Sequence, residues 1–150
     1  MTGQPLYRKV LLKLSGEVLA GEKGAGIDQA VLDRLANEIA EAVELGTRIG
    51  IVAGGGNFLR GADVAASGGR RIAGDQMGML GTLMNAIAFR EALIQRSVPV
   101  RMFSAVPVPS ICDTFTQRDA DAAFEAGEVL VFAGGTGHPF FTTDTGAALR

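Results

Sequence analysis

Three short apolar runs that each end in glycine constrain the fold of this chain more than any other feature. The run at residues 49–53 stops at three consecutive glycines, Gly54–Gly56, which neither a helix nor a strand holds without a large loss of backbone entropy. The other two runs are residues 10–14, followed by Ser15-Gly16, and residues 129–133, followed by Gly134-Gly135-Thr136-Gly137. Because parallel strands end at the same edge of a sheet, we expect the three glycine loops to form one site there.

The order of the expected elements places the chain in the α/β class. Apolar runs predict strands at residues 10–14, 48–53, 98–103 and 129–133, the first of them fully buried. Helical spacing predicts helices at 29–45, 76–95 and 116–127, with Asp28 and Gly46 capping the first and Thr116 with Asp119 opening the third. The helix at 76–95 is apolar on two sides, so we expect it to be buried on both. We expect loops at residues 16–26 and 62–74, and the start of a further helix at Thr143. This alternation favours an αβα sandwich with a mainly parallel sheet, in which residues 1–150 form a single domain.

Composition excludes several classes of protein. A formal net charge of -2 gives no basic field for nucleic acid. The single cysteine, Cys112, rules out an intrachain disulfide and a cysteine-rich metal site, and suits a reducing compartment. Residues 1–7 lack the apolar core of a signal peptide, and no apolar run approaches the roughly 20 residues that span a bilayer. We therefore expect a cytoplasmic protein without membrane or nucleic-acid partners.

The glycine loops indicate a phosphate ligand. The sequence has no Walker-type loop, and no dinucleotide-binding fingerprint follows the first strand. What remains is a dispersed set of glycines with Lys13 and Arg60, which fits a polyphosphate better than a single carboxylate. Any one of these loops, taken alone, would be explained as well by the need for a tight turn.

The individual candidates also have purely structural interpretations. Lys13 lies in an apolar strand, where its charge is costly unless it meets an anion or reaches solvent at the sheet end. Lone histidines in loops are more often exposed than catalytic. The simple alternatives are surface exposure for Arg60, Arg70, Arg71 and His138, and helix capping for Asp75 and Asp144.

Four motifs together resemble the bacterial uridylate kinases of the amino-acid kinase family. They are Lys13-Leu14-Ser15-Gly16-Glu17, Gly54-Gly55-Gly56-Asn57 with Arg60-Gly61, Asp75-Gln76-Met77-Gly78-Met79, and the run from Gly135 to Asp144. The first two are shared in outline across the family, whereas the last two are specific to the uridylate branch. The resemblance covers residues 7–150.

This resemblance implies phosphoryl transfer from ATP to UMP, in pyrimidine nucleotide biosynthesis, with Mg²⁺ accompanying ATP. It places Lys13, Leu14, Ser15, Gly16, Gly56 and Arg60 at the ATP phosphates. It places Gly55, Asp75, Thr136, Gly137, His138, Pro139, Phe140, Phe141, Thr142 and Thr143 at UMP, although the family commonly has asparagine where His138 stands. Lys13, Arg60 and Asp144 would be the catalytic residues, and no residue is assigned as a permanent metal ligand.

The resemblance also bears on completeness and assembly. Family members continue beyond the position of Arg150, so we expect this chain to be the N-terminal, UMP- and phosphate-binding portion of the domain, with the C-terminal part missing. They are typically hexamers regulated by GTP and UTP, which makes Arg90 and Arg101 candidates for an effector site and the long apolar helix a candidate dimer surface. The alternatives are a nucleotide-binding or regulatory fragment without catalysis, and a sister kinase acting on an amino acid or carbamate.

Overall fold

The computed structural model describes residues 5–150, with the backbone alone for Gly61 and Ala62. Its strands are β1 Lys9–Leu14, β2 Arg48–Ala53, β3 Val100–Ser104, β4 Asp113–Thr114 and β5 Val129–Ala133. Its helices are α1 Gly16–Ala20, α2 Gln29–Glu44, α3 Gly61–Ala66, α4 Arg71–Ile94, α5 Gln117–Glu125 and α6 Thr143–Ala148, with a 3-10 turn at Gly21–Lys23. Residues 1–4 of the polar N-terminal segment lie outside the described residues.

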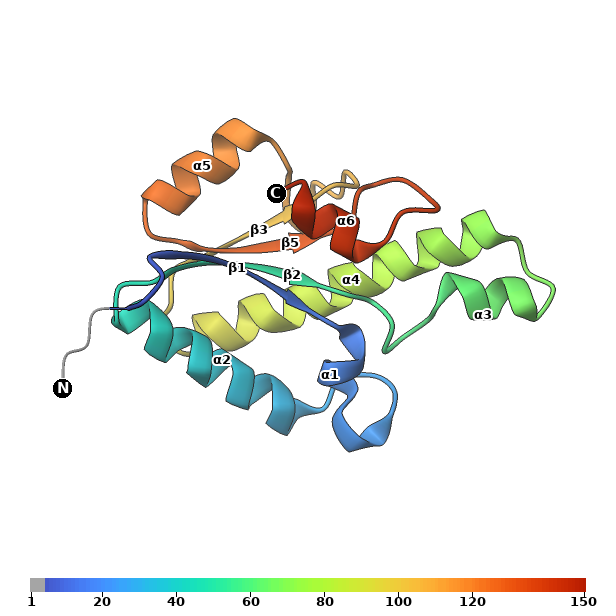
Figure 1. Ribbon diagram of the computed structural model, residues 1–150, viewed down its shortest axis with the longest axis horizontal. Helices are drawn as coiled ribbons and strands as arrows, with labels where there is room; N and C mark the ends of the chain where they lie inside the picture. The colour runs from blue at the N-terminus through green and yellow to red at the C-terminus, as the bar shows by residue number, and fades with distance from the viewer. Residues whose placement is uncertain (1–4) are drawn as a thin grey trace.

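The five strands form one parallel sheet between two helical layers (Figure 1). The strand order is β1-β2-β5-β3-β4, so the three strands that end in glycine are neighbours. Helices α1, α2 and α4 lie on one face of the sheet, and α5 and α6 lie on the other. The predicted αβα sandwich with a parallel sheet is confirmed.

Alternation along β5 shows how its apolar run is used. Val129, Val131 and Ala133 belong to the core beneath α2 and α4, whereas Leu130 and Phe132 belong to a second core against α5. Successive side chains of a strand point to opposite faces, so a strand covered on both sides is apolar throughout. The continuous apolar sequence of β5 is therefore the consequence of burial on two faces.

The first strand is less buried than its sequence predicts. Leu12 and Leu14 pack against the core, but Lys9, Leu11 and Lys13 point to the other face and are exposed. Since β1 is the last strand on its side of the sheet, helices cover that face incompletely. The expectation of a fully buried strand was wrong, and Lys13 carries its charge on the open face.

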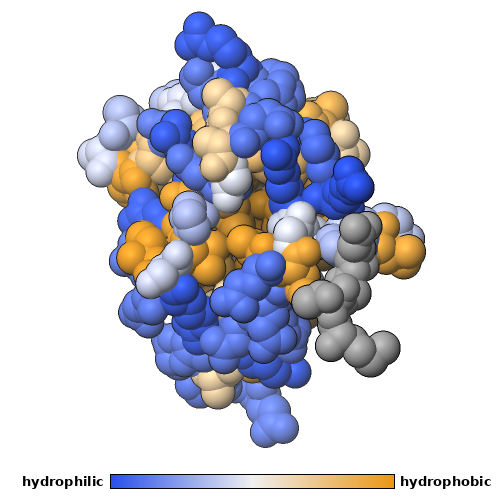
Figure 2. Space-filling view, turned by 90° about the vertical axis from the view of Figure 1, so that its left-hand side faces the viewer, coloured by the Kyte–Doolittle hydropathy of each residue, from blue (hydrophilic) through white to orange (hydrophobic). Residues whose placement is uncertain are grey.

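An apolar band marks this open region on the molecular surface. Seen from the end at which the strands begin, apolar side chains lie between two polar regions (Figure 2). A hollow of about 400 Å³ between the sheet and α5 is lined by Leu11, Gly50, Phe124, Leu130 and Phe132, among others. Within residues 5–150, no helix combines the length and the apolar character that crossing a membrane would need.

Side-chain caps explain why several helix boundaries could be predicted. Asp28 Oδ1 accepts a hydrogen bond from the Ala30 N–H at 3.0 Å at the start of α2, and Thr116 Oγ1 accepts one from Asp119 at 3.1 Å before α5. Gly46 follows α2 with a φ of 92°, the left-handed conformation that favours glycine after a helix. These three predicted boundary signals are confirmed.

Two segments predicted as loops contain helices instead. Within residues 16–26, the hydroxyl of Ser15 accepts a hydrogen bond from the Glu17 N–H and caps α1, whose Leu19 is fully buried. Within residues 62–74, α3 forms and α4 begins at Arg71 rather than at residue 76. Both segments are rich in glycine and small residues, so their apolar periodicity is weak. The short strand β4 was not predicted either.

The long helix α4 has one buried side and one exposed side. Phe89 and Leu93 are fully buried under the sheet. Along the opposite side, Met77, Leu80 and Met84 keep 43%, 54% and 46% of their surface exposed. We call these three residues the α4 stripe. The sequence predicts that α4 is buried on two sides, but in this chain only one side is buried.

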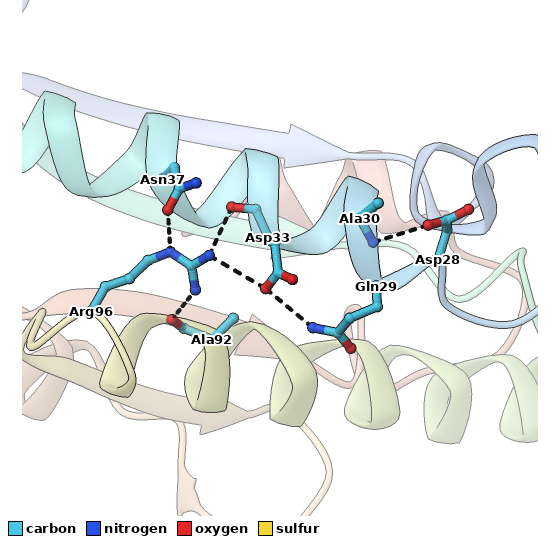
Figure 3. A network of polar contacts seen from close by, with 7 residues as sticks. All are labelled: Asp28, Gln29, Ala30, Asp33, Asn37, Ala92 and Arg96. Carbon is cyan, nitrogen blue, oxygen red and sulfur yellow. Dashed lines mark hydrogen bonds and ion pairs between the residues drawn. The ribbon is translucent and has the colours of Figure 1, made fainter.

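Arg96 fixes the end of α4 to α2 (Figure 3). Its Nη2 donates to the backbone oxygen of Asp33 at 3.0 Å and to Asp33 Oδ1 at 3.3 Å, and its Nε donates to Asn37 Oδ1. Its Nη1 donates to the Ala92 carbonyl oxygen at 2.7 Å. Because the side chain is only 19% exposed, these contacts hold the two helices together as a base for the sheet.

Adjacent residues near the end of α4 allow a matched test of this packing. Leu93 is fully buried and Ile94 is 52% exposed. We expect Leu93→Ala to lower the free energy of unfolding by about 2–5 kcal/mol, because it leaves a cavity beneath the sheet. Ile94→Ala, which removes a side chain of equal volume, should cost less than about 1 kcal/mol. Urea denaturation measures both, and equal losses would contradict the packing described.

Candidate functional site

The glycine loops converge as the sequence predicts. β1, β2 and β5 are neighbours and parallel, so Gly16, Gly54–Gly56 and Gly134–Gly137 follow them at the same edge of the sheet. In Figure 1 this edge lies beside α6 and the first half of α4. The shared site at the carboxyl ends of the strands is confirmed as a spatial cluster.

The middle glycine of the triple is required by a close contact with α4. A Cβ atom on Gly55 would lie 2.5 Å from the carbonyl oxygen of Gly78 and 2.9 Å from the backbone nitrogen of Thr82. A Cβ on Gly56 would meet nothing closer than Arg60 Nε at 3.7 Å. Gly55 therefore lets the loop pack directly on the backbone of α4, whereas the space beside Gly56 is open.

A pocket of about 320 Å³ lies between the triple glycine, α4 and the loop that follows β5. The β2 side contributes Gly55, Gly56, Leu59 and Arg60. Helix α4 contributes Arg71, Asp75, Gly78, Met79 and Thr82, and the later loop contributes Gly135, Thr136, His138, Phe141, Thr142 and Thr143. Glycine backbone, cations, one carboxylate and several hydroxyls thus surround one cavity.

Asp75 joins α4 to the later loop. Its Oδ1 lies 2.9 Å from Arg71 Nε and its Oδ2 accepts a hydrogen bond from the Phe140 N–H, also at 2.9 Å. Burial acts to raise the pKa of this carboxyl, but the Phe140 N–H and the Arg71 guanidinium outweigh it, so the pKa of Asp75 lies below its ordinary value. Asp75 is inside α4, so the alternative that it caps this helix was wrong.

The loop after β5 has a backbone that few sequences tolerate. Gly134, Gly135 and Gly137 have φ values of 78°, 56° and 80°, and Phe140 adopts a φ of 69°. A positive φ is uncommon for an aromatic residue, and here the hydrogen bond from its N–H to Asp75 holds it in place.

Hydroxyl groups order this loop at two further points. Thr136 Oγ1 accepts a hydrogen bond from the His138 N–H at 3.2 Å. Thr142 Oγ1 accepts one from Thr145 at 3.2 Å and caps α6, so Asp144 lies in the first turn of that helix and is not its cap. The hydroxyls and glycines together give the loop a defined path around the pocket.

The two cations expected at phosphate each face a carboxylate. Lys13 Nζ lies 2.8 Å from Asp144 Oδ1, which joins β1 to α6. Arg60 is paired with Glu17 of α1. Both pairs are partly exposed, so each contributes little to stability and leaves its cation available to a competing anion. Lys13 and Asp144, far apart in sequence, are brought together as the resemblance implies.

The structure divides the remaining predicted residues. Of the predicted UMP set, Gly137 and Pro139 line a neighbouring cavity of about 300 Å³ against Leu80 and Leu83, away from the main pocket. The ring of Phe140 is 64% exposed and lies 5.9 Å from the Arg71 guanidinium carbon. The segment from Lys13 to Gly16 and Asp144 lie at the same sheet edge but do not line the pocket.

Arg90 and Arg101, the predicted effector residues, each have a separate partner. Arg90 Nη1 donates to the carbonyl oxygen of Ile111 at 3.0 Å, and Arg101 Nε lies 2.9 Å from Glu128 Oε2. An effector site there stays a prediction.

Sequence reasoning missed Arg71, which it assigned to an exposed turn. Arg71 lines the pocket and pairs with Asp75 one helical turn later. The spacing of four residues was the available signal, since arginine and aspartate at i and i+4 are neighbours on a helix. It went unused because the helix was expected to start after Arg71. Thr82 was missed as well, since nothing in the sequence distinguishes it from other helical threonines.

The described residues offer no ready-made metal site. In residues 5–150, no three side chains of histidine, cysteine, aspartate or glutamate gather closely enough to bind an ion. Asp144 nevertheless lies at the sheet edge where the glycine loops gather, with 71% of its side chain exposed. One carboxylate together with substrate phosphates and water is a usual environment for Mg²⁺, so the donor set fits an ion that arrives with a nucleotide.

Comparison with known proteins agrees with this geometry. The sequence model described as the Amino acid kinase family matches residues 8–150. The chain belongs to the amino acid kinase family. It is 53% identical over 150 residues to the uridylate kinase of Brucella abortus and 55% identical over 150 residues to that of Mesorhizobium japonicum. In both cases the match takes in 100% of this chain and 62% of the relative, so the chain spans about three fifths of their length.

The fold is similar to that of a solved member of the amino acid kinase family. The UMP kinase of Bacillus anthracis superposes with a TM-score of 0.91 at 35% sequence identity, over 96% of this chain and 59% of the other. The parallel sheet and its helices are therefore those of the family, and the resemblance drawn from the four motifs is confirmed at the family level.

The unequal surroundings of the two glycines give a direct test. We expect Gly55→Ala to lower the free energy of unfolding by about 1–3 kcal/mol, because its Cβ would overlap the backbone of α4. Gly56→Ala, with open space at the same atom, should change stability by less than about 1 kcal/mol. Chemical denaturation of both variants decides, and a larger loss for Gly56→Ala would contradict the described seating of the loop.

Proposed function

We propose that this chain carries the UMP-binding and phosphate-binding part of an ATP-dependent UMP kinase. The observation that supports it most is the pocket in which the Asp75 carboxylate faces the triple glycine and the threonine-rich loop. An ionised carboxylate accepts hydrogen bonds only, and one carboxylate can accept from both vicinal hydroxyls of a ribose. The names of the relatives add support, since those at 53% and 55% identity are uridylate kinases.

The proposed site has an acceptor side and a donor side. UMP occupies the pocket, which is lined by Gly55, Arg71, Asp75, Thr136, His138 and residues 141–143. Arg71 was not among the residues predicted from the sequence. The ATP phosphates lie toward Gly56, Arg60 and the segment from Lys13 to Gly16. On UMP binding, the ribose takes the place at Asp75 that the Phe140 N–H now has.

The chemistry needs no general base. The attacking group is a phosphate oxygen of UMP, which is largely ionised near neutral pH because its second pKa is about 6. Catalysis then consists of aligning the two phosphates and neutralising the charge that spreads over the transferred group. Lys13 and Arg60 supply that charge once nucleotide phosphates compete with their carboxylate partners, Asp144 and Glu17.

Asp144 has a second role in this proposal. Released from part of its pairing with Lys13, it would hold Mg²⁺ together with the nucleotide phosphates. When bound, the ion neutralises phosphate charge and orients the transferred group. Asp144 also keeps Lys13 directed at the sheet edge before nucleotide binds.

The proposal extends to assembly and regulation. The α4 stripe gives an apolar surface for a second copy of the chain, within a hexamer. GTP and UTP are proposed as effectors, with Arg90 and Arg101 as candidate contacts. We also propose a cytoplasmic location, which the single cysteine of this chain, Cys112, suits.

Lys13 allows the proposed chemistry to be tested. In the full-length gene product we expect Lys13→Ala to lower kcat about 100-fold or more, with the KM for UMP changed less than about threefold, because its charge acts on the transferred phosphoryl group. Lys9→Ala, on the same strand and the same face, is the matched control and should leave both constants near wild type. Equal losses in kcat and UMP affinity for Lys13→Ala would contradict the assignment.

Asp75 allows the acceptor to be tested. We expect Asp75→Asn to weaken UMP binding about tenfold while 2′-deoxy-UMP, which lacks one of the paired hydroxyls, is affected less. Because the pKa of Asp75 is lowered, the carboxylate stays ionised from about pH 5 to 8, and the difference should not change across that range. Calorimetric titration measures both ligands, and an unchanged UMP affinity would leave Asp75 with a structural role only.

A further inference from the structure

Two buried polar side chains on α4 contact the two glycine loops of the site. Thr82 and Asn85 are 3% and 0% exposed, and they lie one helical turn apart. The Gly134 N–H donates to Thr82 Oγ1 at 2.7 Å, and Asn85 Nδ2 donates to the Gly54 carbonyl oxygen at 2.6 Å. Each side chain thus holds the first residue of one loop, after β5 and after β2 respectively.

The side-chain amides of Asn85 and Asn57 also donate hydrogen bonds to each other. Asn85 Nδ2 donates to Asn57 Oδ1 at 2.7 Å, and Asn57 Nδ2 donates back to Asn85 Oδ1 at 3.0 Å. Asn57 in turn donates from Nδ2 to the Gly26 carbonyl oxygen at 2.7 Å and accepts at its backbone oxygen from the Gly26 N–H at 2.9 Å. Both ends of the triple glycine are therefore tied to α4, and the far end is also tied to the loop before α2.

The proton of the Thr82 hydroxyl is used inside the protein. The hydroxyl donates its one proton to the Met79 carbonyl oxygen at 2.6 Å while accepting from Gly134. It has no proton left for a ligand, although Thr82 lines the pocket. Its contribution is to place Gly134, from which the loop over the pocket departs.

We propose that Thr82 and Asn85 are positioning residues that set the spacing between the two glycine loops and thereby the shape of the UMP pocket. A buried N–H or carbonyl left without a partner is costly, so a loop that lost its contact would move to find another. The first pocket residues beyond these contacts, Gly55 on one side and Gly135 on the other, would move with it. This inference rests on the proposed function of the pocket.

The test compares two threonines that differ in location. Thr82→Val keeps the shape of the side chain and removes the hydroxyl, Thr82→Ser keeps the hydroxyl, and Thr47→Val is the matched control. Thr47 is also buried, at 9% exposure, and its hydroxyl donates to the Tyr7 carbonyl oxygen at 3.2 Å, but it precedes β2 at the opposite edge of the sheet. Thr82→Val loses two hydrogen bonds to the backbone, with Met79 and Gly134, and Thr47→Val loses one, with Tyr7.

We expect Thr82→Val to weaken UMP binding about tenfold in the full-length gene product, measured by calorimetry and as the KM for UMP. Thr82→Ser should remain within about threefold of wild type, and Thr47→Val within about twofold, even if urea denaturation shows equal losses of stability in the two valine variants. Equal UMP affinities for Thr82→Val and Thr47→Val would overturn the positioning role. Failure of the wild-type protein to bind UMP would instead contradict the proposed function.

A second measurement covers the case in which Thr82→Val does not fold. Amide hydrogen exchange of the wild-type protein should show Gly134 protected without ligand and further protected by UMP. Asn85→Asp should bind UMP more weakly than wild type at about pH 8, because an ionised carboxylate cannot donate to Gly54 or Asn57. Binding should recover in part as the pH falls, since the protonated carboxyl regains one of the two hydrogens that the amide donates. Free exchange at Gly134, or a pH-independent ratio to wild type, would overturn the proposal.

Discussion

The contact between the triple glycine and the backbone of α4 is the constraint on which this site depends. Because Gly55 has no Cβ, the backbone of the loop after β2 can lie directly against the backbone of α4 at Gly78 and Thr82. The helix that receives it is itself fixed, by buried side chains such as Phe89 beneath the sheet and by Arg96 against α2. The geometry of the pocket is thus largely a property of where α4 lies.

Elements with strong chemical signals could be predicted from the sequence. Strands β2 and β5 are apolar because they are covered on both faces, and α2 carries both an aspartate cap and a terminal glycine. Helices α1 and α3 were missed because they are short and lie in segments rich in glycine and small residues, so that neither periodicity nor length marks them. Helix α1 depends on the cap from Ser15, and α3 depends on its tertiary contacts with α4, which a single sequence does not display.

The site was predictable in its parts and not in its arrangement. Strands that end in glycine, with Lys13 and Arg60 nearby, indicated a phosphate site, and the parallel sheet does bring these loops together. Apart from the family resemblance, nothing in the sequence distinguishes the packing of Gly55 from that of Gly56, because the difference comes from a helix that packs on one of them. It also could not assign Arg71, whose role requires knowing that α4 already includes that residue.

The pocket and the α4 stripe lie on opposite sides of a single helix. Arg71, Asp75 and Thr82 point to the pocket, whereas Leu80 and Met84 lie on the other side of the same helix. A helix with its side chains is about 10–12 Å across. A molecule seated on the stripe would therefore be separated from a bound nucleotide by the thickness of a single helix, with no second layer of protein to absorb a displacement.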